Sequence, residues 1–186
     1  MTDAVFGAGP QPGYQWLLAD DDGDYQRLQA IADHRPGEAW QPPPMHLLDR
    51  DDDGTRLRQA DLPWLLSATL ALTPAASSGL RPLLEPYGEF LPVSGTAAGI
   101  ELFNCTAWTD ALDEDASELA RFSDGRIMRI RSAVLTPAAF AEAEVVRLRQ
   151  TPTGPLYFAA PLVERIAALG LTGTVFQPRG TVADRG

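Results

Sequence analysis

Alternating aspartates at residues 49–54 have the spacing in this chain that most resembles a metal site. The opening D-x-D-x-D-G of an EF-hand calcium loop is reproduced by Asp49, Asp51, Asp53 and Gly54. In such a loop, alternate carboxylates converge on one cation. Position eight of this loop is Arg56, and position twelve, which requires a bidentate Glu, is Ala60. The loop is incomplete, so the sequence favours a solvated acidic turn over a calcium site.

A second group of carboxylates precedes this turn and comprises Asp20, Asp21, Asp22 and Asp24. Residues 1–61 contain 12 acidic and 5 basic residues, a net charge of −7, whereas residues 62–186 contain 13 and 10, a net charge of −3. Two solvated turns would explain this concentration. The alternative is an acidic face that steers a basic protein partner toward the chain and raises the association rate.

Side chains that serve as nucleophiles or bases occur without a catalytic motif. His34 and His46, the only histidines, lie beside prolines, and the acidic residues around Ser117 would oppose a developing alkoxide. Cys105 is the only cysteine, which excludes an intramolecular disulfide, and its apolar strand-like surroundings predict a buried thiol. We therefore expect a protein that is not an enzyme and that uses no metal or cofactor.

The overall charge excludes several classes of partner. The formal net charge is −10, with a sequence pI near 4.5, and all 15 basic residues are arginine. Such a chain repels nucleic acid and anionic membranes and favours basic proteins. No window approaches 18 apolar residues, and the first residues lack a basic region followed by an apolar run. We expect a cytoplasmic protein that binds neither nucleic acid nor membrane.

The length and residue order predict one domain over residues 1–186. Glycine and proline are frequent in residues 1–13, where we expect an irregular arm, and we expect a flexible tail at residues 180–186. Short strands are expected at 14–18 and 45–48, and a helix from Pro74 to Leu84.

The second half of the chain is expected to be mostly strands, at 90–93, 100–108, 127–135, 145–148, 156–158 and 174–176. A helix starts near Pro161, with Leu162, Ile166 and Leu169 on one apolar face and Gly170 at its end. The predicted fold is therefore α+β, with a largely antiparallel or mixed sheet, a few short helices and a C-terminal strand-helix-strand unit.

Motifs between Gly88 and Phe176 resemble a bacterial family of polymorphic-toxin immunity proteins, family eleven of that series. In chain order the motifs are GEFLPV at 88–93, FN at 103–104, DALDEDAS at 110–117, DGRI at 124–127 and LGLTGxxF at 169–176. They span about half of the chain, and their order and spacing carry the resemblance.

The resemblance implies a non-enzymatic immunity protein that neutralises a cognate toxin domain by covering its functional surface. The partner-binding candidates lie in the less similar N-terminal region, and they are Asp20, Asp21, Asp22, Asp24, Tyr25, Trp40, Asp51, Asp52 and Asp53. The motif residues expected to maintain the fold are Asp113, Ser117, Gly125, Gly173 and Phe176. Two alternatives are a metal-dependent hydrolase that uses the Asp-rich turns and an acidic adaptor or scaffold protein.

Overall fold

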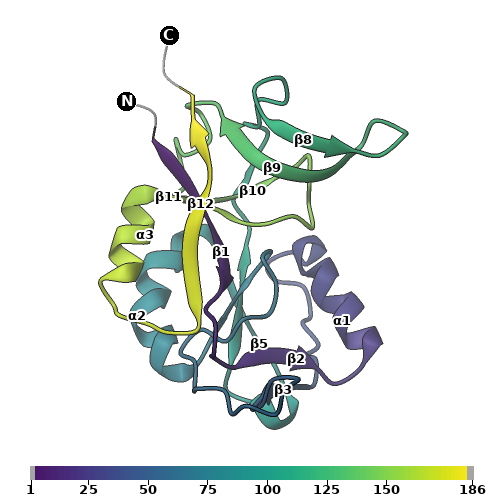
Figure 1. Cartoon of the computed structure of the whole chain (residues 1–186), viewed down its shortest axis with the longest axis vertical. Coiled ribbons are helices and arrows are strands. Elements are labelled where there is room, and N and C mark those ends of the chain that lie inside the picture. The colour runs from purple at the N-terminus through teal and green to yellow at the C-terminus, as the bar shows by residue number, and fades with distance from the viewer. Residues whose placement is uncertain (1–2, 184–186) are drawn as a thin grey trace.

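Strand β1 (Ala4–Pro10) lies in the middle of the largest sheet and pairs antiparallel with β12 (Thr174–Val182) along its whole length (Figure 1). The computed structural model describes residues 3–183. The expectation of an irregular arm at residues 1–13 is wrong for residues 4–10, which form β1, and residues 1–2 lie outside the described part. The glycines and prolines of this segment indicated a loop, but Val5 and Ala8 are buried, and two neighbouring strands satisfy the backbone. In the expected tail at 180–186, Gly180–Val182 belong to β12, and residues 184–186 lie outside the described part.

The described residues place seven strands in this sheet. From edge to edge they are β7 (Trp108–Thr109), β10 (Val145–Leu148), β11 (Tyr157–Ala159), β1, β12, β9 (Ile127–Leu135) and β8 (Glu118–Arg121). Strand β12 pairs parallel with β9, and β10 pairs parallel with β7, whereas the other neighbours are antiparallel. The prediction of an α+β fold with a mixed sheet is confirmed.

Two smaller sheets complete the β-structure of the described residues. One has the order β4 (Leu70–Leu72), β6 (Glu101–Cys105) and β5 (Gly88–Pro92), and the other pairs β2 (Trp16–Ala19) with β3 (Met45–Leu48). Both pairings are antiparallel throughout. The β2–β3 ribbon lies at the lower end of the molecule in Figure 1, far from β8 at the top.

The helices begin at residues that the sequence marks. Helix α2 (Pro74–Leu84) starts after Thr73, whose hydroxyl accepts a hydrogen bond from the Ala76 amide at 3.4 Å. Helix α3 (Ala160–Ala167) carries Pro161 in its first turn and buries Leu162 and Ile166. The other helical segments are α1 (Asp22–Gln29) and short 3₁₀ turns at Ala30–Asp33, Glu85–Tyr87 and Gly95–Ala97.

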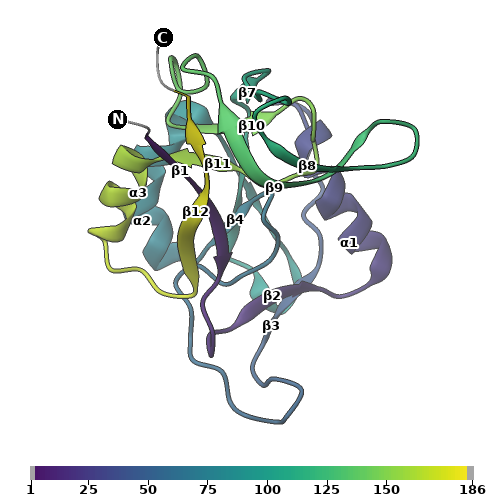
Figure 2. The same ribbon diagram turned by 45° about the horizontal axis from the view of Figure 1, so that its top comes forward.

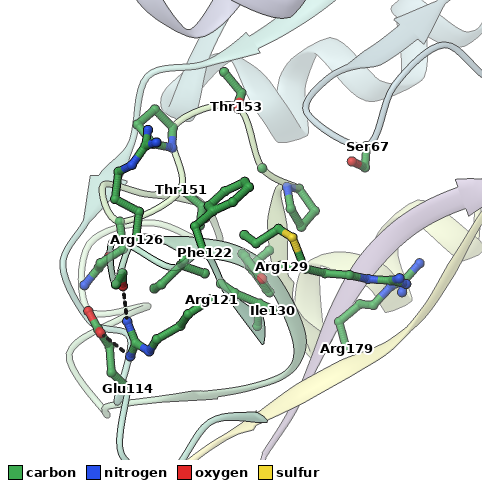
Figure 3. A pocket seen from close by; sticks show the side chains of 18 residues that line it. Ser67, Glu114, Arg121, Phe122, Arg126, Arg129, Ile130, Thr151, Thr153 and Arg179 are labelled. Atoms are coloured by element: carbon green, nitrogen blue, oxygen red, sulfur yellow. Dashed lines mark hydrogen bonds and ion pairs between the residues drawn. The ribbon is translucent and has the colours of Figure 1, made fainter. Parts of the chain in front are cut away.

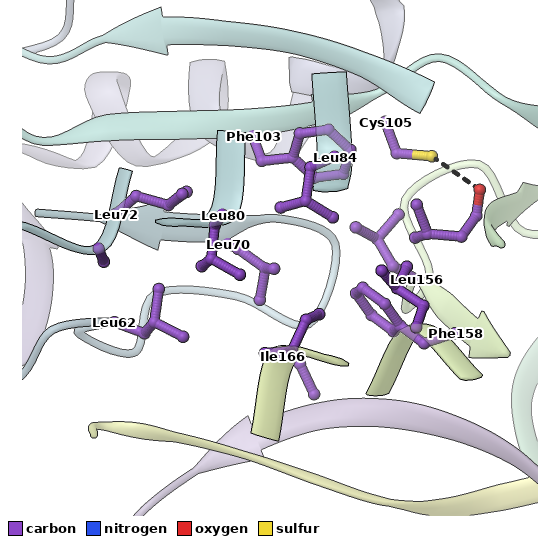
Figure 4. Close-up of a cluster of buried hydrophobic side chains, with 14 residues drawn as sticks. Leu62, Leu70, Leu72, Leu80, Leu84, Phe103, Cys105, Leu156, Phe158 and Ile166 are labelled. Carbon is purple, nitrogen blue, oxygen red and sulfur yellow. Dashed lines mark hydrogen bonds between the residues drawn. The ribbon is translucent and has the colours of Figure 1, made fainter. Parts of the chain in front are cut away.

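The central hydrophobic core lies between α2, α3 and the sheets (Figure 4). Its fully buried members include Leu80 and Leu84 of α2, Phe103 of β6 and Phe158 of β11. A second cluster packs under the β2–β3 ribbon, and a third packs beneath β9 and β10. Removal of this apolar surface from water is the main driving force for folding.

Arg147 of β10 is completely buried and connects the sheets. Its guanidinium donates to the carbonyl oxygens of Ala68 at 3.0 Å, Pro152 at 3.2 Å and Cys105 at 3.3 Å, and reaches Oδ1 of Asn104 at 3.5 Å. Burial lowers the pKa of this side chain. Among residues 3–183 no carboxylate pairs with it, so neutral oxygens from β6 and two loops replace its hydration shell.

Replacement of Arg147 should strongly destabilise the fold. In Arg147→Met, the three carbonyl oxygens lose their donor inside the protein, and each unsatisfied buried group costs about 1–3 kcal/mol. We expect the free energy of unfolding in urea to fall by roughly 3 kcal/mol or more. The matched control is Arg149→Met in the turn directly after this strand, where an exposed side chain should change stability by less than about 0.5 kcal/mol. Equal effects at the two positions would contradict the role of Arg147.

Gly180 permits β12 to approach β9. A Cβ atom at this position would lie 1.9 Å from the Ala133 carbonyl oxygen, a backbone atom that cannot move aside cheaply. Gly180→Ala should therefore lower the free energy of unfolding by roughly 1–3 kcal/mol. Gly9→Ala in β1 is the control, because a Cβ there has no atom within 4 Å, and we expect stability to be unchanged or slightly raised. Thermal melts of both variants distinguish these outcomes.

Candidate functional site

The two aspartate-rich turns lie at opposite ends of the β2–β3 ribbon. Ala19 pairs with Met45 and Trp16 pairs with Leu48, so the turn after β2 and the turn after β3 leave the ribbon in opposite directions. Three residue steps of about 3.3 Å separate them by roughly 10 Å, close to one screening length at physiological salt. The carboxylates therefore form two separate patches. Figure 2 shows the loop after β3 projecting at the bottom of the molecule.

In the first turn, most of the carboxylates have local partners. Asp21 caps α1, because its Oδ1 accepts a hydrogen bond from the Asp24 amide at 2.8 Å, and Asp20 contacts Nδ1 of His46 at 2.7 Å. Asp24 is 1% exposed and pairs with Arg27, so this candidate lies inside the protein. Its burial follows from its place at the third position of α1, on the face that also buries Leu28. Asp22 remains exposed.

In the second turn, the carboxylates hold the loop or face solvent. Oδ1 of Asp51 accepts from the amides of Asp53 at 3.1 Å and Thr55 at 2.8 Å, and Asp49 accepts from the Gln15 amide group at 2.6 Å. Asp52 and Asp53 are exposed. Across residues 3–183, no three His, Cys, Asp or Glu side chains lie together in an arrangement that could hold a metal ion.

The two aromatic candidates have different surroundings. Tyr25 on α1 is 42% exposed and open to a partner. Trp40 is half-buried, its indole donates to the Pro92 carbonyl oxygen at 2.7 Å, and its ring packs edge-on against His34 at 5.2 Å. Trp40 therefore anchors the segment before β3 to β5 and offers a partner little free surface.

A surface hollow of about 500 Å³ lies beside the second turn. Trp16 lies in its wall and is 39% exposed, and Asp51 and Asp52 lie on its rim. The apolar remainder is formed by Pro10, Pro12, Tyr14, Leu48 and Leu57. The hollow therefore joins an exposed indole to acidic groups. Sequence reasoning missed Trp16, although its neighbour Leu17 is fully buried, and strand alternation then turns Trp16 outward.

The motif residues make contacts within the fold. Ser117 Oγ donates to the Asp113 carbonyl oxygen at 2.5 Å and accepts from the Val134 amide at 2.9 Å, which joins the turn before β8 to β9. Gly125 has φ 87° at the tip of the β8–β9 hairpin, a conformation that glycine adopts freely. Phe176 packs edge-on against Phe158, with ring centroids 5.0 Å apart.

Gly173 lies where the loop after α3 meets the segment before β4. Its φ is 100°, and a Cβ there would lie 2.5 Å from both the Ala60 Cβ and the Leu62 carbonyl oxygen. The adjacent Thr172 amide donates to Oδ2 of Asp61 at 3.0 Å. These contacts join two segments that are far apart in the sequence.

A larger groove of about 840 Å³ lies beneath the β8–β9 hairpin, at the other end of the molecule (Figure 3). Its arginines are Arg121, Arg126, Arg129 and Arg179, and its one acidic lining residue, Glu114, pairs with Arg121 at 2.8 Å. Phe122 and Met128, which are 48% and 55% exposed, add apolar surface. Sequence reasoning saw the alternation at Arg129–Arg131 but had no signal for the position of Arg179.

Neither comparison of the sequence with known proteins identifies a relative, since no protein-family model matches and no curated protein is significantly similar. The helices within residues 3–183 are all too short or too polar to cross a membrane. The described residues form a single α+β domain, with an acidic, Trp-lined hollow at one end and an arginine-lined groove at the other. The resemblance to immunity proteins rests on the sequence motifs.

The Cys105 thiol is buried, as predicted, and burial raises its pKa to about 11. A backbone hydrogen bond with Ala107 and the charge of Arg147 oppose this rise, and desolvation prevails. Because the thiol titrates near 8.5 in an unfolded chain, its contribution to stability is complete below that pH and is lost as the pH rises toward 11.

This difference predicts a pH dependence that a variant can isolate. Between pH 9 and 11, the free energy of unfolding should fall more steeply in the unmodified chain than in Cys105→Ala. Urea titrations at several pH values measure both slopes. Parallel curves for the two proteins would show that the thiol ionises as easily in the folded state as in the unfolded one.

Proposed function

We propose that this chain is a non-enzymatic immunity protein that binds a co-produced toxin domain in the cytoplasm and covers its functional surface. The motifs from Gly88 to Phe176 support the class, and the Trp16 hollow with its acidic rim supports the mode of binding. The partner surface that fits this hollow is basic, with an apolar side chain that inserts against the indole. The proposal requires no cofactor.

Trp16 is the residue best placed to supply binding energy. Tryptophan is enriched among interface residues whose truncation costs 2 kcal/mol or more, and such residues lie inside a rim of near-neutral contacts. Asp51 and Asp52 are on the rim of the hollow, with Asp53 next in the same exposed turn. Exposed rim charges change the association rate and its salt dependence more than the final affinity. The indole and the aspartates therefore have separable roles.

The acidity of the N-terminal region supports electrostatic steering. Residues 1–61 carry a net charge of −7 out of −10, and β2, β3 and the loop after them lie together at one end of the molecule (Figure 1). A cationic toxin approaching this end would meet an attractive field before contact, which raises the association rate at low salt.

The function is tested by co-expression with the toxin gene that neighbours the coding sequence. Cells that carry both genes should survive, and the purified proteins should form a complex. Trp16→Ala should raise the dissociation constant by about 30-fold or more, equivalent to about 2 kcal/mol. Phe122→Ala, which truncates an exposed aromatic side chain in the arginine-lined groove, should leave the dissociation constant unchanged. Survival without complex formation would contradict neutralisation by binding.

Steering is tested with a charge-matched pair of variants. Asp52→Asn with Asp53→Asn should slow association with the toxin several-fold at low salt, and the difference should vanish as salt screens the charges. Asp51 is not substituted because its side chain accepts hydrogen bonds from two backbone amides of the same turn. The control, Asp115→Asn with Glu142→Gln, removes two exposed acidic charges outside the N-terminal region and should have a smaller effect. Stopped-flow rates that do not depend on salt would rule out steering.

A further inference from the structure

The groove beneath the β8–β9 hairpin borders a strand edge that has no partner. Strand β9 pairs with β12 only from Ala133 to Leu135, and its first six residues, 127–132, pair with β8 alone. Within the described residues, no strand occupies the opposite edge of this stretch. In Figure 2 the hairpin extends away from β12. The lining of the groove includes residues 127–130 of β9 and Arg179 of β12. An edge of this kind offers backbone amide and carbonyl groups to an added strand.

Arg179 reaches the groove because of a bulge in β12. Val5 pairs with Gly180, but Phe6 pairs with Pro178, so Arg179 is an extra residue on this strand. Bulges of this type redirect a side chain. The opposite strand makes room for it, because a Cβ on Gly7 would lie 2.7 Å from Cγ of Arg179. The backbones of β1 and β12 are thus shaped around this arginine.

Arg129 and Arg179 are cations without an anionic partner inside the described chain. Arg121 pairs with Glu114 and Arg126 pairs with Asp124, but neither Arg129 nor Arg179 lies within 4.0 Å of a described carboxylate. In Figure 3 the two side chains converge at one side of the groove. Two guanidinium groups facing a shared space repel each other, and a carboxylate between them would replace the repulsion with charge-assisted hydrogen bonds.

We infer that this groove binds an extended acidic peptide segment of another protein, which adds as a strand to the free edge of β9. Alternate side chains of such a segment point to opposite faces. Carboxylates on one face would contact Arg129 and Arg179, and apolar side chains would pack on Phe122 and Met128. Residues 127–132 span roughly 17 Å, which a segment of five or six residues matches.

A protein segment fits the groove better than nucleic acid does. The free edge of β9 pairs with another peptide backbone, which nucleic acid lacks. The net charge of −10 repels a long polyanion, whereas a short segment with two or three carboxylates meets mainly the nearby arginines. This inference goes beyond the proposed immunity function, since the groove lies at the other end of the molecule from the Trp16 hollow.

The test uses an acetylated, amidated and fluorescein-labelled hexapeptide of alternating Glu and Val, with anisotropy as the readout. The full chain should bind it saturably, and a Lys-Val peptide of the same length should not bind. Arg129→Glu with Arg179→Glu should weaken binding at least tenfold. Arg56→Glu with Arg58→Glu, the same charge change at the acidic end, should leave it within twofold. Equal binding by both double variants, or no binding by the unmodified chain, would overturn the inference.

Two further controls test whether the peptide adds as a strand and whether the groove prefers a peptide to nucleic acid. The same peptide with alternate backbone nitrogens methylated cannot pair along one edge, and it should bind at least tenfold more weakly. Unchanged affinity would exclude strand addition. An oligothymidylate of equal charge that binds more tightly than the peptide would assign the groove to nucleic acid and overturn the inference.

We expect peptide binding at the groove to be independent of toxin binding at the Trp16 hollow. Trp16→Ala should retain peptide binding, and the Arg129→Glu, Arg179→Glu variant should retain neutralisation of the toxin. The side chains changed in the groove are exposed, so circular dichroism melts should match those of the unmodified chain. If the arginine double variant loses peptide binding and also melts at a lower temperature, Phe122→Ala provides the check. This variant should bind the peptide at least threefold more weakly and keep the melting temperature of the unmodified chain. Unchanged binding by that stable variant would also contradict the assignment.

Discussion

The buried guanidinium of Arg147 links two sheets and two loops of the domain from a position without solvent contact. It joins β10 to β6 through the Cys105 and Asn104 oxygens, and it holds two loops through Ala68 and Pro152. Pro152 lies in the wall of the arginine groove, and the Ala68 loop leads into β4. A charge buried among neutral oxygens is tolerated only while all of them stay in place. The core and the wall of the arginine-lined groove are therefore stabilised together.

Proline and glycine predicted the helices whose ends they mark. Pro161 and Gly170 marked the region of α3, and Pro74 marked the start of α2. Residues 1–13 show the opposite case, because glycine and proline indicate a loop unless neighbouring strands pair with the backbone. The burial of Arg147 also depends on segments that are distant in the sequence. Nothing near it in the sequence indicates that oxygens from residues 68, 105 and 152 will surround it.

The surface sites also include features that the sequence predicted and features that depend on tertiary structure. The sequence located the aspartate turn after β3, but the turn expected at residues 20–24 is only a bend at 20–21, because Asp22 and Asp24 belong to α1. It also did not show that the β2–β3 pairing places the two aspartate groups at opposite ends of a ribbon. It could not show that Asp24 is buried on α1. Trp16 could be inferred from strand alternation beside Leu17, whereas Arg179 depends on a bulge opposite β1. Register and bulges are tertiary features, and they decide which charged side chains meet.

In the proposed function, the molecule binds its partner at the acidic end while the scaffold around Arg147 stays unchanged. Hydrogen–deuterium exchange of the chain, free and in complex with the proposed toxin partner, measures both parts of this proposal. We predict slower exchange in residues 12–18 and 47–58 on binding, with β6 and β10 equally protected in both states. Protection confined to other parts of the surface, or new exchange in β10, would contradict the account.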